Sequence, residues 1–360
     1  MTGGVPGSGR RVRRVGVGAG VAAVSAVLVA VLPRLLQTTW PEVWMLLALV
    51  PAGWLLVLAV VWLAGLVVHT LVLSASMPGL SARRALALNL AGSSVANVVP
   101  LGGPVSLGLT TGMARSWGFR STAIGAFLTV STVWNVAARA GLGLVGLAWW
   151  VTRPAATHPV LVGAAATPVA VLLAGTVAIL TWDRAAGLVA GAAGRLAAAG
   201  TRVVAVLHRR DGGRATGVGV RDRVAGSVAD VRRSSVAIAR RSWPALSAGM
   251  LGYSALLCVL LALCLRVLGA TQPVVTVVAA VCVERLLTAV PLTPGGAGVA
   301  EIGLAGSLVL AGVEPAAAAA AALLYRLYTF ALEIPVGLVV ATGWGLARRP
   351  RPVLRTGRSA

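Results

Sequence analysis

The stretch that decides the fold reads V-E-R-L-L-T-A-V-P-L-T-P-G-G-A-G-V-A-E-I, from Val283 to Ile302. It lies inside an apolar segment, 274–312, whose centre contains two prolines and three glycines. Proline removes a backbone donor and breaks a helix, so this segment cannot form one straight span. Each limb of about 15–17 residues reaches only ~22–25 Å as a helix, less than the ~30 Å core of a membrane. The segment is therefore predicted to be a hairpin of two short helices.

A second segment, 85–112, carries a similar break. Its centre reads N-V-V-P-L-G-G-P, from Asn97 to Pro104, so V-P-L followed by glycine and proline occurs twice in the chain. Interrupted segments at corresponding positions of two halves are typical of transporters built on inverted repeats, where they mark the binding site. Two Pro-kinked helices in an ordinary bundle are the alternative. The breaks are expected at Pro100, Gly102, Gly103, Pro291 and Pro294.

The rest of the chain has the composition of a membrane protein. Hydrophobic residues make up 58% and charged residues 11% of the 360 positions, whereas a soluble domain has about 25% charged residues. A spanning helix needs about 20 mostly apolar residues. The runs that meet this requirement are 15–36, 43–73, 121–151, 159–182, 244–266 and 316–346. We expect an all-α polytopic membrane protein with about six full spans and two re-entrant or broken-helix hairpins, arranged as an inverted repeat in one interpretation.

The net charge of +22 indicates the orientation of the chain. Every basic residue is Arg, and 25 of the 31 lie in the segments 1–14, 74–84, 113–120, 183–243 and 347–360. The positive-inside rule places these segments in the cytoplasm. We therefore expect a multi-pass protein of the plasma membrane, with a transmembrane bundle at 15–346 between a basic arm and a basic tail, both cytoplasmic. The hairpins then enter the membrane from opposite faces.

The basic insert 183–243 contains valines and arginines at helical spacing around 220–233. This pattern predicts an amphipathic helix on the anionic inner leaflet. No nucleic-acid-binding module accompanies the basic residues, and no metal-ligand, nucleotide-loop or nucleophile motif occurs. We expect membrane phospholipids as partners, and no nucleic acid, metal or cofactor. Asn89 and Asn97 fall on nearly one face of a short helix, where polar contacts between helices are expected.

A few charged residues remain inside apolar segments, where charge is costly and often functional. Glu284, Arg285, Glu301 and Arg326 cluster around the second hairpin with no net charge. Glu284 and Arg285 are adjacent and point to different sides of a helix, which predicts a pairing of one of them with Arg326 or Glu301. Glu301 comes near the start of the returning helix, where the helix dipole favours a carboxylate.

The start of that helix is also a candidate anion site. Free amides at Gly295, Gly296 and Gly298 could receive a phosphate, and Arg285 and Arg326 would supply bidentate counter-charges. The alternative is that the ion pairs only hold the hairpin in place. Arg139, one turn after Asn135, needs either a lipid phosphate or interior carbonyls as its partner.

Two parts of the chain resemble a known family. Glu284 to Glu301, with L-L-Y-R-L-Y-T-F at Leu323 to Phe330, is similar to the C-terminal signature of the lysylphosphatidylglycerol synthase transmembrane-region family. Asn89 to Gly103 resembles the earlier hairpin of that family. The resemblance implies a bundle with re-entrant elements that moves or handles phospholipids or lipid-linked molecules. The residues that match the second motif are Glu284, Arg285, Pro291, Pro294, Gly295, Gly296, Glu301 and Arg326.

The chain also departs from the family. Ser131, Thr132 and Asn135 stand where family members often carry further charges, and only 14 residues follow Leu346. We therefore expect no aminoacyl-transferase domain, no synthesis of lysyl-lipid and no enzyme of that kind. The expected function is that of a lipid flippase or transporter-like protein. Its anionic headgroup would contact Arg285, Arg326, Glu284, Glu301, Gly295, Gly296 and Arg139. A non-transporting scaffold for a separately encoded lipid or glycolipid enzyme is the alternative. An intramembrane lipid-modifying enzyme is a third, weaker alternative, for which the sequence offers no pair of nucleophile and base.

Overall fold

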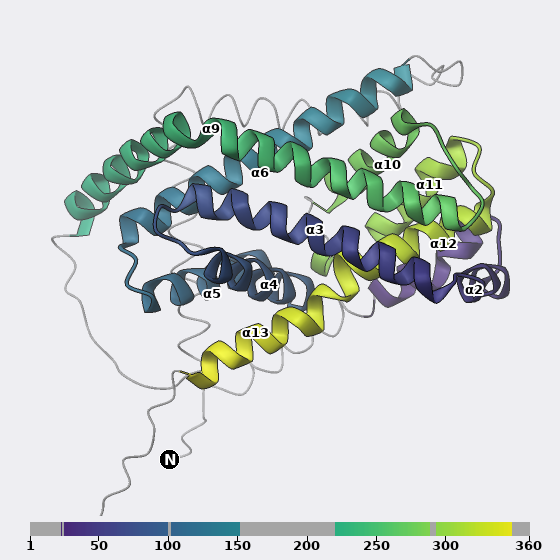
Figure 1. Cartoon of the computed structure of the whole chain (residues 1–360), viewed down its shortest axis with the longest axis horizontal. Helices are drawn as coiled ribbons and strands as arrows, with labels where there is room; N and C mark the ends of the chain where they lie inside the picture. Colours follow the sequence, from purple (N-terminus) through teal and green to yellow (C-terminus); the bar gives the residue numbers. More distant parts are fainter. Residues whose placement is uncertain (1–22, 24, 100–101, 152–219, 289–292, 348–360) are drawn as a thin grey trace, which may run out of the picture.

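The protein is described by a computed structural model over residues 23, 25–99, 102–151, 220–288 and 293–347 (Figure 1). These residues form helices and no strand. Among them, four helices are long and apolar enough to cross a membrane: Ala52–Ser76, Ser121–Gly146, Asp230–Val267 and Pro315–Ala347. The chain is therefore an all-α polytopic membrane protein, as predicted. The predicted span 159–182, the arm 1–14 and the tail 347–360 lie wholly or almost wholly outside the described residues.

Both predicted hairpins exist as pairs of short helices. In the first, α4 (Ala82–Val98) packs against α5 (Gly102–Ser116). In the second, α10 (Val274–Leu287) packs against α11 (Val299–Leu310), and the short 3-10 turn η1 (Pro294–Gly296) precedes α11. The structure thus confirms a break in both apolar segments. Pro100 and Pro291 themselves lie outside the described residues.

Glycine is required at both turns. A Cβ atom on Gly102 would lie 2.5 Å from the carbonyl oxygen of Ala96, so the two limbs approach too closely for any side chain there. In the second hairpin Gly295, Gly296 and Gly298 all have positive φ, a conformation that glycine adopts without steric cost. The same residue type therefore serves a close approach in one hairpin and backbone geometry in the other.

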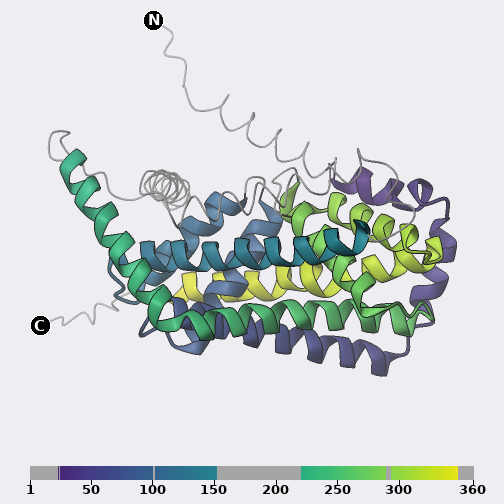
Figure 2. The ribbon, with the colours of Figure 1, turned by 90° about the horizontal axis from the view of Figure 1, so that it is seen from above.

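The helices differ from the predicted segments at two places, and proline is involved in both. The predicted span 43–73 is divided into α2 (Trp40–Ala48) and α3 (Ala52–Ser76), with Pro51 as the N-cap of α3. Conversely, the insert 183–243 and the span 244–266 do not separate at their boundary, because α9 runs from Val220 to Val267 with Pro244 inside it. Figure 2 shows that α9 changes direction along its length, as helices do at an internal proline.

The last predicted span is continuous but contains an irregular turn. α12 (Pro315–Arg326) is capped by Glu314, whose carboxylate accepts hydrogen bonds from the amides of Ala316 (3.0 Å) and Ala317 (2.8 Å). A π-helical turn, η2 (Leu327–Ala331), follows directly after Arg326 and leads into α13 (Glu333–Ala347). π-Helical turns are rare and often found at functional sites.

The hairpins belong to two different parts of the core. One buried cluster joins α10, α11 and α12 to α3 and α9, and the buried alanines 316–322 allow close packing of α12. A separate cluster joins α4 and α5 to α6 (Ser121–Val151) and the end of α3. α13 packs along α4, so the C-terminal helix joins the two parts (Figure 1).

Candidate functional site

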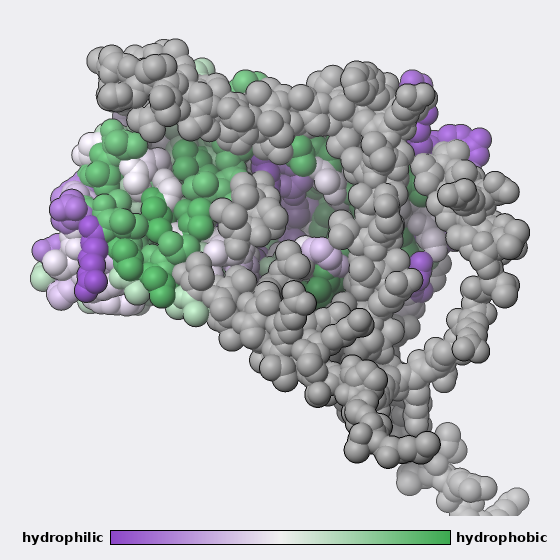
Figure 3. Space-filling view, turned by 180° about the vertical axis from the view of Figure 1, so that it is seen from behind, coloured by the Kyte–Doolittle hydropathy of each residue, from purple (hydrophilic) through white to green (hydrophobic). Residues whose placement is uncertain are grey.

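A cavity of about 710 Å³ lies between the two hairpins. The first hairpin contributes Asn89, Ser93 and Asn97 to its wall, and the second contributes Arg285 and Thr288. The helices α3, α6, α9, α12 and α13 complete it. Figure 3 shows hydrophilic residues set back between hydrophobic surfaces on one side of the molecule. The breaks in both hairpins therefore lie at the wall of a cavity that also holds polar side chains.

The tips of the two hairpins meet at this cavity. α4 contacts η1, and a Cβ atom on Gly295 would lie 2.6 Å from the side-chain oxygen of Asn97 and 2.4 Å from the ring of Phe330. Both hairpin tips therefore bound one space.

Arg326 is the centre of the ion-pair network behind the cavity. Its Nε donates to Glu301 (2.9 Å) and its Nη1 to Glu284 (3.2 Å), while its Nη2 donates to the Gly295 carbonyl (2.8 Å). The predicted pairing of one of the two neighbours with Arg326 is confirmed for Glu284, and the pair of Arg326 with Glu301 is an additional contact. All three guanidinium nitrogens are engaged, so Arg326 ties η1 to α10 and α11.

Glu301 performs the helix-start role that its position predicts. Its second carboxylate oxygen accepts a hydrogen bond from the Gly298 amide at 2.7 Å. The Gly296 amide donates to the Thr293 carbonyl at 3.1 Å. The expectation that the amides of Gly296 and Gly298 are free for a phosphate was therefore wrong, because the chain itself already uses both.

Glu284 and Arg285 pair with each other despite being adjacent. Glu284 has no solvent exposure. Arg285 donates from Nη2 to Glu284 at 2.7 Å and also contacts it through Nε. The expectation that these two side chains point to different sides of the helix was wrong, because the long arginine side chain bends back over its own helix to reach Glu284. Glu284 thereby holds Arg285 on one side and Arg326 on the other.

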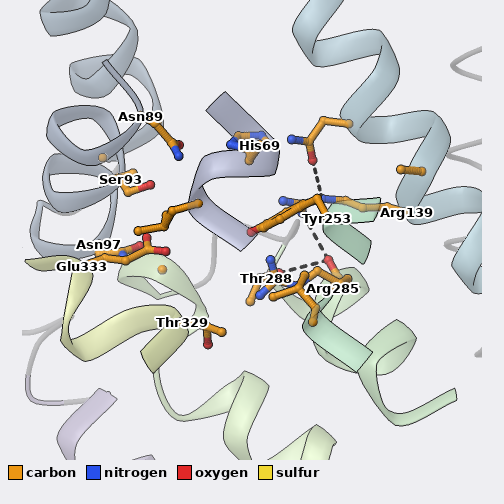
Figure 4. Close-up of a pocket in the computed structure, with 18 of the residues that line it drawn as sticks. His69, Asn89, Ser93, Asn97, Arg139, Tyr253, Arg285, Thr288, Thr329 and Glu333 are labelled. Carbon is orange, nitrogen blue, oxygen red and sulfur yellow. Dashed lines mark hydrogen bonds between the residues drawn. The ribbon is translucent and has the colours of Figure 1, made fainter. Parts of the chain in front are cut away.

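Arg139 reaches the cavity from α6. Its Nε donates to Asn135 at 3.0 Å and its Nη1 to the Arg285 carbonyl at 3.1 Å. Of the two partners predicted for Arg139, interior carbonyls are therefore found. Figure 4 shows Arg139 and Arg285 together on one wall of the cavity.

The opposite wall holds residues that we did not single out as site residues. Figure 4 places Glu333 beside Asn97, with Ser93 and Asn89 further along the same wall. His69 and Tyr253 also line the cavity, with ring centroids 4.8 Å apart. A carboxylate inside an apolar run was the available signal for Glu333; nothing in the sequence marks the histidine, the tyrosine or the hydroxyl groups.

Comparison with known proteins gives one match. The family model described as the lysylphosphatidylglycerol synthase TM region matches residues 18–337. No curated protein and no solved structure matches the chain. The matched range contains both hairpins and every described residue of the cavity wall.

Proposed function

We propose that this chain, which belongs to the lysylphosphatidylglycerol synthase TM-region family, binds an anionic lipid headgroup between its hairpins and moves it across the membrane. The observation that carries the proposal is the pair of arginines on one wall of the cavity. Arg285 Nη1 and Arg139 Nη2 make no hydrogen bond within the described part of the chain, while the other nitrogens are engaged. A phosphate accepts hydrogen bonds from such a pair.

The network behind the wall supports this assignment. Glu284 fixes Arg285 through two nitrogens, and Arg326 fixes Glu284. The fixed orientation lowers the entropy that Arg285 would lose on binding a ligand. Arg285 and Arg139 are therefore the proposed headgroup ligands, and Arg326, Glu284 and Glu301 are positioning residues.

The size of the cavity also fits a headgroup. Its volume of about 710 Å³ falls within the ~300–1,000 Å³ of small-molecule sites. The asparagines and hydroxyls on the wall of the first hairpin would contact the remaining polar atoms of the headgroup. We assign binding and movement, and no bond-forming step, to this site.

The proposal also includes the membrane in which the protein lies and the orientation of the chain in it. The concentration of Arg in alternate loops supports a plasma-membrane protein with cytoplasmic termini. The hairpins would then enter from opposite faces, and their meeting tips would lie at depth.

Transbilayer movement of fluorescent phosphatidylglycerol in proteoliposomes tests the function. We expect the wild type to accelerate movement and Arg285→Gln to abolish most of the acceleration. Arg266→Gln is the matched control, because Arg266 is an exposed residue at the end of α9, and it should behave as the wild type. An inactive wild type that co-purifies with a lipid-modifying enzyme would instead support a scaffold.

A further inference from the structure

We infer that Glu333 is a proton-binding site, and that the cavity takes up its anionic headgroup together with a proton. The inference rests on the proposed function and adds to it a coupling between proton binding and headgroup binding. It starts from a contrast among the three buried carboxylates around the cavity: Glu284 and Glu301 each lie within ion-pair distance of an arginine, whereas Glu333 forms no ion pair within the described residues.

Glu333 lies where a ligand and a proton can both reach it. Its relative exposure is 9%, and its side chain lines the main cavity and a smaller adjoining pocket between α3 and α9. Its polar neighbours are Ser93 of α4 and Trp62 of α3. Both are uncharged, so neither compensates a carboxylate charge. An ionisable group of this kind inside a membrane protein is a typical proton-carrying group.

The charged and titratable groups that face Glu333 come from four helices. They are Arg285 of α10, Arg326 of α12, Tyr253 of α9 and, across the same cavity, His69 of α3. α4, which packs along α13, contributes only uncharged residues to the cavity wall. Glu284 pairs with both Arg285 and Arg326, and Glu301 pairs with Arg326. With Arg139 beside them, these three arginines face two carboxylates, which leaves one uncompensated positive charge on the arginine wall.

Binding of an anion changes the net charge of the arginine wall that faces Glu333. While the cavity is empty, the arginine wall favours ionised Glu333 by charge attraction. A phosphate on Arg285 and Arg139 neutralises this attraction and adds negative charge to the same low-dielectric space, which favours the protonated carboxyl group. By thermodynamic reciprocity, a proton on Glu333 then strengthens anion binding.

The coupled cycle balances in protons and charge. A proton binds to a carboxylate oxygen of Glu333 as the headgroup enters, and it leaves the same oxygen when the headgroup is released. A proton gradient can therefore drive an anionic headgroup in the direction in which protons flow. The chain contains no nucleotide-binding loop, and this coupling requires none.

The experiment measures the affinity of the full-length protein for phosphatidylglycerol in phosphatidylcholine nanodiscs between about pH 5 and 8. We expect the wild type to bind more tightly as the pH falls, by up to about tenfold per pH unit. Glu333→Gln, which is nearly isosteric and has no titratable proton, should bind with an affinity independent of pH. His69→Gln is the matched variant for the other titratable group and should retain the slope. A pH indicator should report proton uptake on binding by the wild type and none by Glu333→Gln.

The outcomes separate the two proposals. Tight binding by the wild type without pH dependence, or a slope that survives in Glu333→Gln, overturns the coupling and leaves the proposed function intact. A slope lost in His69→Gln but retained in Glu333→Gln assigns the proton to His69 and also overturns the inference. A wild type that does not bind phosphatidylglycerol at any pH contradicts the proposed function itself.

Discussion

The two hairpins share a backbone design and differ in charge. Each consists of two short packed helices joined at a glycine-containing turn, and the two tips meet at one cavity. The first hairpin offers the cavity amides and hydroxyls, such as Asn89 and Ser93, whereas the second offers Arg285 backed by a network of ion pairs. Similar backbones in the two hairpins therefore enclose the space, while the charged groups are concentrated in the second hairpin.

The largest expected effect is on the ion-pair network of the second hairpin. Arg326→Met removes the cation that pairs with Glu284 and Glu301, and breaking a buried pair costs about 3–5 kcal/mol because charge is left uncompensated. We expect a large fall in the Tm measured in detergent. Combining Arg326→Met with Glu284→Gln and Glu301→Gln should recover part of the loss. A Tm unchanged in Arg326→Met would mean that the network does not hold the hairpin.

The second largest effect is expected on ligand affinity, which substitutions in the two hairpins should lower to different extents. Arg285→Gln removes a charged hydrogen-bond donor and should weaken phosphatidylglycerol binding by about ten- to hundredfold. Asn97→Ala on the opposite wall removes a neutral group and should weaken binding by less than about tenfold. Equal losses in the two variants, measured in nanodiscs, would show that the binding chemistry is shared evenly between the hairpins.

The tip of the first hairpin provides a smaller, purely steric test. Gly102→Ala would bring a Cβ atom to 2.5 Å from the Ala96 carbonyl oxygen, while a Cβ atom on Gly103 meets nothing within 4 Å. We expect Gly102→Ala to destabilise the protein by about 1–3 kcal/mol and Gly103→Ala to leave the Tm nearly unchanged. Equal Tm values for these neighbouring variants would show that the turn tolerates a side chain.

Much of this architecture follows from residues that act locally. Pro and Gly interruptions predicted both hairpins, and the charge pattern predicted a pairing across the second hairpin that is found between Glu284 and Arg326. Pro51 and Pro244 show what the sequence does not predict, because proline caps the start of one helix and lies inside another. Which outcome occurs depends on the packing around each proline, which a single sequence does not contain.

The parts of the site that sequence reasoning missed depend on rotamers and long-range contacts. Arg285 bends back to Glu284, an arrangement that helical geometry alone does not predict. Glu333 faces the arginine wall only because α13 packs along α4. His69 and Tyr253 reach the cavity from helices that the sequence marks only as apolar spans.

Photo-crosslinking with a phosphatidylglycerol that carries a diazirine in its headgroup tests the central claim most directly. A shared binding cavity predicts label on peptides from both α4 and α10, and loss of that label in Arg285→Gln but not in Arg266→Gln. Label confined to the exposed apolar face of α3, for example around Leu56 and Val60, and unchanged by Arg285→Gln, would contradict a headgroup site between the hairpins.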